Sequence, residues 1–387
     1  MTPRAITGIG ICSAIGIGRE EFFRALPVTT RLCDSPRPAA ESFDSSGYTD
    51  AGVAEVRDFD AAKFLGDKGL RSLDRLTKLL VVAARLATHD AGMKKDGVFV
   101  GITAERIGIV CSNAYGSLEA ITELDRVAVL EDARYINPAK FPNTVANSAS
   151  GYASIWEDLR ALNVAISDGN CGALDAVTCA DIYMHNSRAD AILVGGAEAL
   201  SEALFLAFRR LGIFETGARI GEGSALLVME DLAHARRRGA HVLAEVIGCG
   251  ASFDAPDSQG ARMIHASKEA MARAITDALR DAGIEASAVD ATVSGIAGLR
   301  VFDSVEQAGI DLGLGREAPI WAPKTLLGET LGAGGAMSMA TAIGILHGHA
   351  PKVLERGVAP STPKTLLVTS MGYYGNATAV LMRKSPL

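Results

Sequence analysis

Short apolar runs alternate with longer amphipathic stretches along the whole chain. Each short run is rich in Val, Ile, Leu or Ala and is bounded by glycine or charged residues, a pattern that predicts a buried β-strand. Six such strands are expected, at 105–112, 189–198, 223–231, 242–250, 291–298 and 365–372. Residues 73–92 and 267–283 carry apolar positions at i, i+3, i+4 and i+7 and end on glycine, which predicts helices. This alternation predicts an α/β fold with largely parallel, buried strands.

The pattern also divides the chain into two weakly similar halves, residues 1–239 and 240–387. Each half opens with a strand, continues through helices and closes with a glycine-rich strand. A basic helix end, HARRRGA at 234–240, separates them without a low-complexity linker. The two halves are therefore expected to pack as one body.

Composition narrows the function classes. Of 387 residues, 48% are hydrophobic, and 38 Lys and Arg face 45 Asp and Glu, giving a net charge of −7. This much apolar surface predicts an ordered chain. A net negative charge without basic blocks argues against nucleic acid or an anionic membrane surface as the main partner. No run approaches the ~20 apolar residues that span a bilayer, and the start lacks a signal-peptide layout. A soluble, cytoplasmic protein is expected.

Neither a metal nor a nucleotide cofactor is expected. The six cysteines are scattered without a CxxC pair, which is typical of reduced thiols. His347 and His349 follow an apolar helix-like run and are interpreted as a solvated helix end. Gly8 and Gly10 lack the third glycine and the downstream acidic residue of a dinucleotide loop, so they predict tight packing of a strand against a loop.

The stretch 163–198 holds the most informative pattern. An apolar strand, NVAIS, leads through the small turn DGN into a helix, and a glycine-rich strand follows. A side chain at such a turn lies at a helix N-terminus, where the dipole and free N–H groups favour an anionic nucleophile. Asn170 and Cys171 occupy that turn.

Around this turn the chain resembles the β-ketoacyl synthases of the thiolase superfamily, which make fatty acids and polyketides by Claisen condensation. The resembling blocks occur in the family's order, at 5–16, 136–155, 189–199, 221–240, 324–338 and 370–377. The resemblance implies two βαβαβαββ halves packed as a five-layered α/β/α/β/α body in a dimer. It implies no cofactor.

The catalytic positions depart from the family pattern. The family's nucleophile is a cysteine, and ungapped counting from both flanking strands places Asn170 there, with Cys171 next along. The resemblance assigns the first catalytic histidine to Gly295, and the second to Glu329, while Lys324 of the Lys-x-x-x-Gly run is retained. No catalytic position is therefore intact.

The expected size of each effect indicates what the loss of these catalytic residues means for condensation. Losing one preorganised donor of this kind lowers the rate by ~10²–10³-fold. A carboxylate such as Glu329, placed ~4 Å from a malonyl carboxylate or enolate, repels it by about 4 kcal/mol at an effective dielectric constant of 20. We expect no condensation of malonyl units by this chain alone.

Within the family, the turn is most similar to that of chain-length factors, which carry Gln-Ala-Gly-Gly-Leu-Asp-Ala where this chain has Asn-Cys-Gly-Ala-Leu-Asp-Ala at 170–176. Such subunits pair with an active ketosynthase that supplies the cysteine and histidines. The implied partners are that ketosynthase and an acyl carrier protein bearing the chain, in type II polyketide, aryl polyene or fatty-acid-like elongation.

The resemblance also suggests a tunnel and an interface. Leu118, Ile121 and Leu124 form an apolar stripe that borders the acyl tunnel in the family, although such a stripe also suits plain core. Tyr373 matches the gating aromatic of the family's glycine loop and equally suits a packing role. The interface-like segment carries the apolar residues Ile136, Phe141, Val145 and Ile155.

Alternative roles remain open for three of these residues and for the function of the chain. Asn170 is either an active-site amide or the N-cap of the following helix. Cys171 is either a reactive thiol or a buried inert one. Glu329 pairs with Lys324 or with a partner chain. The rival functions are an acyltransferase that uses Cys171 without decarboxylation and a homodimeric acyl-binding protein.

Overall fold

A mixed β-sheet runs through the molecule in the computed structural model, which describes residues 1–48, 51–256 and 264–385. Within these residues the strand order is β13-β12-β14-β15-β11-β1-β10-β8-β6-β7, with β2 paired to β1. The strands are β1 (Arg4–Ser13), β2 (Gly16–Ile17), β6 (Ile107–Ser112), β7 (Asn163–Ile166), β8 (Ala191–Glu198), β10 (Gly223–Asp231), β11 (Ala244–Phe253), β12 (Ala291–Val293), β13 (Ile320–Trp321), β14 (Thr365–Met371) and β15 (Asn376–Arg383). Two small pairs stand apart: β3 (Val53–Ala54) with β9 (Ile220–Gly221), and β4 (Lys94–Lys95) with β5 (Val98–Phe99).

The sheet consists of two five-stranded blocks. Strands β1, β10, β8, β6 and β7 form the first, and β11, β15, β14, β12 and β13 form the second. The blocks join where three residues of β1, starting at Arg4, pair with three residues of β11, ending at Val246. Because only these three residue pairs join the two blocks, the blocks separate beyond the junction, and helices pack between them.

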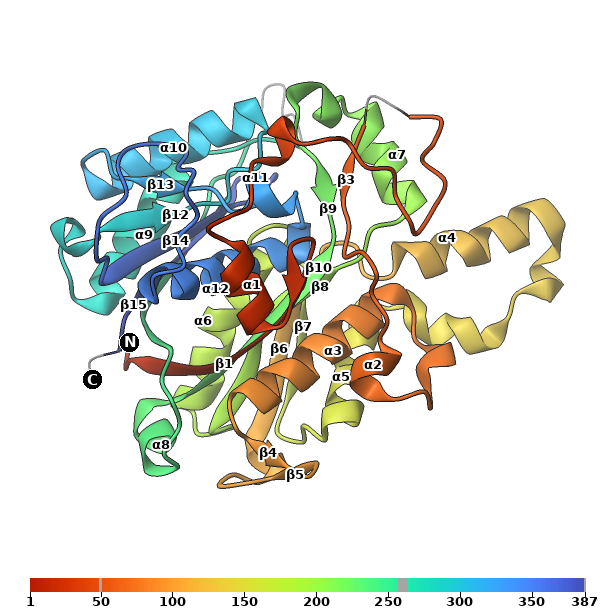
Figure 1. Ribbon diagram of the computed structural model, residues 1–387, viewed down its shortest axis with the longest axis horizontal. Helices are drawn as coiled ribbons and strands as arrows, with labels where there is room; N and C mark the ends of the chain where they lie inside the picture. The colour runs from red at the N-terminus through yellow and green to blue at the C-terminus, as the bar shows by residue number, and fades with distance from the viewer. Residues whose placement is uncertain (49–50, 257–263, 386–387) are drawn as a thin grey trace.

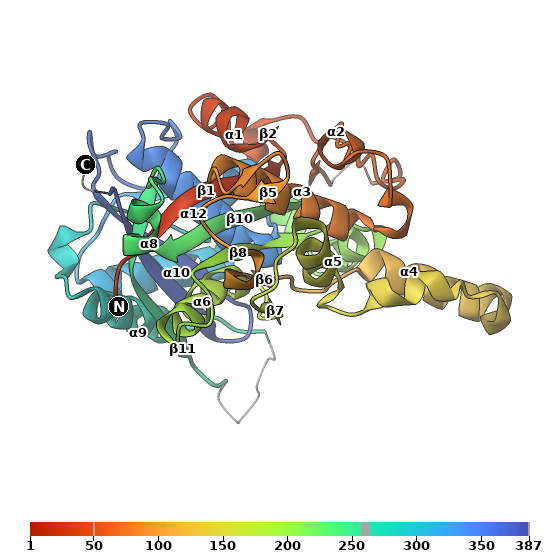
Figure 2. The same cartoon turned by 90° about the horizontal axis from the view of Figure 1, so that it is seen from below.

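Helices complete five layers (Figures 1 and 2). Between the blocks lie α6 (Gly172–His185) and α12 (Gly334–Leu346), whose side chains share one apolar core with both. Outside the first block lie α3 (Arg75–Asp90) and α5 (Ser148–Glu157); outside the second lie α9 (Lys268–Ala282) and α10 (Arg300–Leu314). The remaining helices are α1 (Arg19–Ala25), α2 (Ala62–Leu65), α4 (Leu118–Val127), α7 (Glu202–Arg210), α8 (Leu232–Arg237) and α11 (Lys324–Leu327). The five-layered α/β fold expected from the sequence is confirmed.

The expectation of largely parallel strands is wrong. Parallel pairing occurs between β6 and its two neighbours and between β12 and its two neighbours. The pairs β1–β10, β10–β8, β11–β15 and β14–β15 are antiparallel. Because helices cover both faces of each block, antiparallel strands are buried on both sides as well, and an apolar run does not reveal strand direction.

Two glycines let β1 approach α3 closely. A Cβ atom at Gly8 would stand 2.5 Å from the Ala87 carbonyl oxygen, and one at Gly10 would stand 1.8 Å from that of Ala83. Any larger residue would force strand and helix apart. The tight packing predicted for these glycines is present, but the neighbour is a helix and not a loop.

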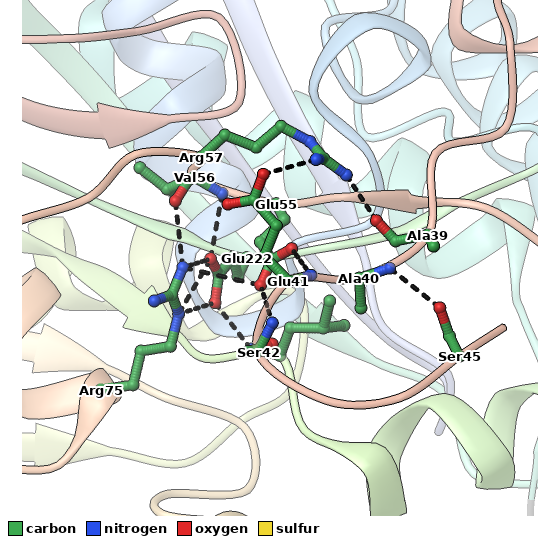
Figure 3. Close-up of polar contacts among 11 residues, drawn as sticks. Ala39, Ala40, Glu41, Ser42, Ser45, Glu55, Val56, Arg57, Arg75 and Glu222 are labelled. Carbon is green, nitrogen blue, oxygen red and sulfur yellow. Dashed lines mark hydrogen bonds and ion pairs between the residues drawn. The ribbon is translucent and has the colours of Figure 1, made fainter.

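A buried carboxylate cluster fixes the long segment between α1 and α2 to the sheet (Figure 3). Glu222, just before β10, pairs with Arg75 of α3 at 2.5 Å. Glu55 accepts the backbone N–H groups of Glu41 at 2.6 Å and Ser42 at 2.9 Å. Fully satisfied buried networks of this kind hold a loop in one conformation.

One segment leaves the compact body. Residues 118–147, which we call the arm, begin with α4 and project beyond the layers before the chain returns at α5 (Figures 1 and 2). Ser117 caps α4 by accepting the N–H of Ala120. The arm exposes large apolar side chains, namely Ile121, Val129, Leu130, Tyr135, Phe141 and Val145. Among the described residues, none of the helices has the length and apolar character to cross a membrane.

Candidate functional site

The turn between β7 and α6 places Asn170 and Cys171 in the interior, 3% and 0% exposed. Helix α6 begins at Gly172, one residue later than expected, and Cys171 occupies its N-cap position without a side-chain cap. The Asn170 amide points instead toward Glu329, with Nδ2 3.4 Å from Oε2. The N-cap reading of Asn170 is therefore wrong, because its side chain bonds across the site and not to the helix.

The Cys171 thiol is held as a neutral donor. Its Sγ donates to the Ser370 carbonyl oxygen at 3.4 Å, and the Ser370 hydroxyl donates to the Asn170 carbonyl oxygen at 2.7 Å. Burial raises the pKa of Cys171 well above its ordinary value, and the nearby carboxylates of Asp175 and Asp168 raise it further. A nucleophilic thiol needs the thiolate form and access, and this site provides neither.

Four donors converge on the Glu329 carboxylate. The Lys324 ammonium lies 2.8 Å from Oε1 and 3.1 Å from Oε2. The Leu331 N–H donates to Oε1 at 2.8 Å, and the Tyr373 hydroxyl donates to Oε2 at 2.9 Å. The Asn170 amide adds its longer contact. Lys324 and Glu329 are 2% and 1% exposed, so this ion pair is fully enclosed.

Local backbone geometry folds Lys324 and Glu329 onto each other. Helix α11 ends at Leu327, and the φ of 84° at the following Gly328 lies in the left-handed region that favours glycine. Beyond it, the Glu329 N–H donates to the Arg219 carbonyl oxygen at 2.7 Å, and the Gly221 N–H donates to that of Glu329 at 2.8 Å. The backbone of Glu329 is thus fixed beside β9, and its side chain faces Lys324.

Carboxylates of α10 occupy the turn that contains Gly295. The Gly295 N–H donates to Glu306 at 2.8 Å, and the Thr369 hydroxyl donates to the same oxygen at 2.7 Å. The Gly298 N–H donates to Asp303 at 2.9 Å. Burial raises the pKa of both carboxyls. The backbone donors of this turn are consumed inside the chain.

Gly295 belongs to the same site. A Cβ atom there would stand 3.4 Å from Ser370 Cα, next to the residue that bonds Asn170 and Cys171. The structure therefore gathers all three positions that the resemblance assigned to catalysis, together with Lys324 and Tyr373. Of these residues, Lys324 lines a hollow of about 310 Å³, together with the turn at 296–298 among others.

Three carboxyl groups of the site, of which Glu198 and Glu306 are buried and Asp303 is half-buried, were not predicted. Besides Asp303 and Glu306, Glu198 at the end of β8 accepts the N–H groups of Ala114 at 2.7 Å and Gly332 at 3.2 Å. Burial raises the pKa of Glu198 to about 7. The signals were present in the sequence: Glu198 closes an apolar strand run, and Asp303 and Glu306 share one helix face directly after the glycine turn.

The predicted tunnel residues fall in two environments. Leu118 is half-buried and packs in the same apolar cluster as Tyr373 and the fully buried Phe205. Ile121 is 38% exposed, and Leu124 is half-buried further along α4. The structure thus brings Leu118 toward the site and leaves Ile121 on the arm surface.

The predicted interface residues lie mostly at the surface. Phe141, Val145 and Ile155 are 64%, 49% and 76% exposed, and Ile136 is half-buried. Scattered single apolar residues are normal on a protein surface, but Phe141 and Val145 belong to the group of exposed apolar side chains on the arm, and Ile155 lies on α5.

Comparison with known proteins agrees with this geometry. The model of the β-ketoacyl synthase N-terminal domain matches residues 1–235, and that of the β-ketoacyl synthase C-terminal domain matches residues 243–355. A 3-oxoacyl-[acyl-carrier-protein] synthase 2 from Coxiella burnetii is 28% identical over 98% of both chains. A putative polyketide beta-ketoacyl synthase 2 from Streptomyces coelicolor is 29% identical over 98% of this chain and 94% of its own.

Among solved structures, the ishigamide ketosynthase/chain length factor superposes over the full length of both chains, with a TM-score of 0.87 at 24% identity. That likeness concerns the fold. The two family models together cover most of the chain, in the order in which the two sheet blocks occur. The chain belongs to the β-ketoacyl synthase family.

Proposed function

We propose that this chain is a non-catalytic, chain-length-factor-like subunit that pairs with an active β-ketoacyl synthase and shapes the tunnel for the growing acyl chain. The observation that carries the proposal is the closed arrangement around Glu329. Lys324, Tyr373, Leu331 and Asn170 all direct their donors to this one carboxylate. These contacts hold the four groups on the carboxylate, in the place where an enolate or a thioester oxygen would need them.

Electrostatics supports the same conclusion. Burial raises the pKa of Glu198 and of Asp303, and the charge of the nearby Glu329 raises both further. Lys324 is the one cation that contacts Glu329 in the described residues. An incoming malonyl carboxylate would meet the carboxylate of Glu329 in a buried site, where charge repulsion is little screened.

The acyltransferase alternative loses support at Cys171. Its thiol is enclosed and donates to a carbonyl oxygen, and burial keeps it protonated at neutral pH. Covalent catalysis needs an activated nucleophile beside a base. The groups around Cys171 are carboxylates that oppose a thiolate, so they do not activate it.

The surface supports a partner. Strand β7 ends the sheet order, so one of its edges has no strand beside it in the described part of the chain. Ile155, on the neighbouring helix α5, and Phe141 of the arm are both exposed. Free strand edges and contiguous apolar surface are features of obligate interfaces, which bury ~2,000–5,000 Å². We place the ketosynthase partner on this side.

The proposed substrate is an acyl chain on an acyl carrier protein. The relative from Coxiella burnetii bears that carrier in its name, and the one from Streptomyces coelicolor is named for polyketides. We assign the subunit to type II polyketide, aryl polyene or fatty-acid-like elongation, in which the partner supplies the nucleophile and this chain supplies tunnel wall.

The test compares the purified chain with the chain co-expressed with a cysteine-and-two-histidine ketosynthase. Offered malonyl and acyl carrier substrates, the chain alone should form no condensation product and no acyl adduct on Cys171, and the pair should form product. Asn170→Cys alone should restore no condensation, because Gly295 and Glu329 still leave the enolate without donors. Turnover by the chain alone would refute the proposal, and an adduct on Cys171 would favour the acyltransferase.

The homodimeric alternative is resolved by the same preparations. If the chain forms a stable homodimer that binds acyl carrier protein and ignores the ketosynthase in size-exclusion chromatography, the acyl-binding function replaces the one proposed. A heterodimer of one copy each, with products that neither subunit makes alone, supports the proposal.

A further inference from the structure

We propose that the chain contains an intact receptor for a small carboxylate, and that Glu329 occupies it as a tethered ligand. The site then does more than lack catalytic groups. It binds the carboxylate of Glu329, and this carboxylate excludes the carboxylates of substrates. The inference concerns this chain's own donors and stands apart from the pairing proposed above.

The donor set has the form of a carboxylate receptor. One ammonium, one backbone N–H, one phenol and one amide reach the two oxygens of Glu329, each oxygen receiving at least two of them. Bonds to an ionised acceptor are about twice as strong as neutral ones. Leu331 and Lys324 are close to Glu329 in sequence, whereas Asn170 and Tyr373 come from the turn before α6 and from beyond β14.

The receptor persists without Glu329 because other contacts position its donors. Asn170 is fixed through its backbone carbonyl oxygen, which accepts the Ser370 hydroxyl at 2.7 Å. The Tyr373 ring stacks edge-on against Phe302 with centroids 4.7 Å apart. Gly335 and Gly334 begin α12 beside Lys324, and a Cβ at Gly334 would stand 2.6 Å from its Cε. The lysine stem is therefore confined.

Lys324 would need an anion if Glu329 were removed. A buried ammonium without a partner is strongly unfavourable. The other buried carboxylate within its electrostatic reach is Glu306, which already accepts the Gly295 N–H and the Thr369 hydroxyl. An anion from solvent would satisfy the vacated donors, and Lys324 also lines the hollow of about 310 Å³.

Formate and acetate are the matched probes, because they carry the same head group as the glutamate side chain. In Glu329→Ala they should bind and raise the melting temperature; with a Kd of about 10 mM, 100 mM acetate should raise it by about 2 °C. Equal concentrations of chloride control for ionic strength. Isothermal titration of the same variant should give one site per chain.

Two variants separate this receptor from general salt effects. Glu329→Gln keeps the shape of the side chain, so the site stays filled and acetate should change its melting temperature no more than chloride does. Glu329→Ala combined with Lys324→Met removes the cation, and acetate should again have no specific effect. Wild type should behave like Glu329→Gln.

The outcomes decide the inference. Acetate-specific stabilisation of Glu329→Ala alone, with acetate between Lys324 and Tyr373 in a crystal structure, supports it. An equal response of all four proteins overturns it. Failure of Glu329→Ala to fold even when expressed and purified in 100 mM acetate also overturns it, because a free carboxylate would then not replace the tethered one.

Discussion

The candidate site and the arm use the same pair of residue types in opposite surroundings. In the site, Lys324 and Glu329 pair at 2.8 Å and are 2% and 1% exposed. On the arm, Lys140 pairs with Glu123, and their side chains are 42% and 51% exposed. The arm meanwhile exposes apolar side chains such as Phe141. The candidate site therefore buries an ion pair at the positions that the resemblance assigns to catalysis, whereas the arm leaves apolar side chains exposed to solvent.

The energetics of the two pairs differ for a physical reason. An ion pair at the surface contributes little to stability, because water solvates the separated charges nearly as well. In the enclosed pair, the ammonium of Lys324 and the carboxylate of Glu329 satisfy each other away from water. Exposed apolar surface, in contrast, gains free energy only when something covers it. The ion pair therefore keeps the candidate site filled, and the apolar surface of the arm is suited to contact with another protein.

Removing each lysine tests the comparison most strongly. Lys324→Met leaves the Glu329 carboxylate buried without its cation, and we expect the free energy of unfolding to fall by about 3–5 kcal/mol. Lys140→Met on the arm should lower it by less than about 1 kcal/mol. Urea unfolding at pH 7 measures both.

A double variant controls for lost packing. Lys324→Met with Glu329→Leu removes both charges and should recover most of the stability, since apolar replacement of a buried pair is often neutral. Equal losses for Lys324→Met and Lys140→Met would show that the two pairs are energetically alike and would dissolve the contrast.

The second prediction concerns pH at the centre. The pKa of Glu198 is about 7 in the folded protein against an ordinary 4.5, because the carboxyl is buried. The folded state therefore holds a proton that the unfolded state has released between these values. The stability contributed by this group is fully present below pH 4.5 and is lost as pH rises through 7, a change of about 3 kcal/mol.

Glu198→Gln carries no such proton. Its stability relative to wild type should therefore rise by about 3 kcal/mol from pH 4.5 to pH 8, measured by urea unfolding across that range after circular dichroism has confirmed the fold. Parallel stability curves for the two proteins would mean that Glu198 titrates alike in the folded and unfolded chain.

The third prediction moves to the arm side. Phe141→Asp and Ile155→Asp place a charge on side chains that are 64% and 76% exposed, so the isolated chain should keep its stability within about 0.5 kcal/mol. Pairing with the co-expressed ketosynthase should weaken by at least tenfold, as expected when a central apolar contact is lost.

Val358→Asp is the matched control, because Val358 is equally apolar and 84% exposed but lies outside the arm and α5. It should leave pairing unchanged. Sedimentation of the co-purified subunits gives the affinities. Undiminished pairing of both arm-side variants would place the interface elsewhere.

The sequence revealed more of the site's members than of its contacts. The Lys324-x-x-x-Gly328 run followed by Glu329 suggested an ion pair, which the structure contains. That Tyr373 donates to Glu329 was not foreseen, because this contact joins chain segments 44 residues apart and depends on how the blocks pack. Whether neighbouring strands run parallel or antiparallel could not be predicted for a similar reason, because an apolar run is equally buried in either direction. The start of α6 was displaced by one residue, since Asn170 suits a cap by type but bonds elsewhere.

The smallest effect expected is a change in product length at the root of the arm. Leu118 is half-buried in the apolar cluster that includes Tyr373, and Ile121 is 38% exposed one turn further along α4. If these side chains border the growing chain, Leu118→Ala should lengthen the product and Leu118→Trp should shorten it, while Ile121→Ala and Ile121→Trp act in the same directions but less. Mass spectrometry of products from the co-purified pair measures this, and size-exclusion chromatography verifies that pairing survives.

Because Leu118→Ala removes only part of one side chain, turnover should stay within a few-fold of wild type, which separates a tunnel effect from damage to the partner's active site. Identical products from all four variants, with the complex intact, would leave Leu118 as ordinary core and move the tunnel wall away from α4.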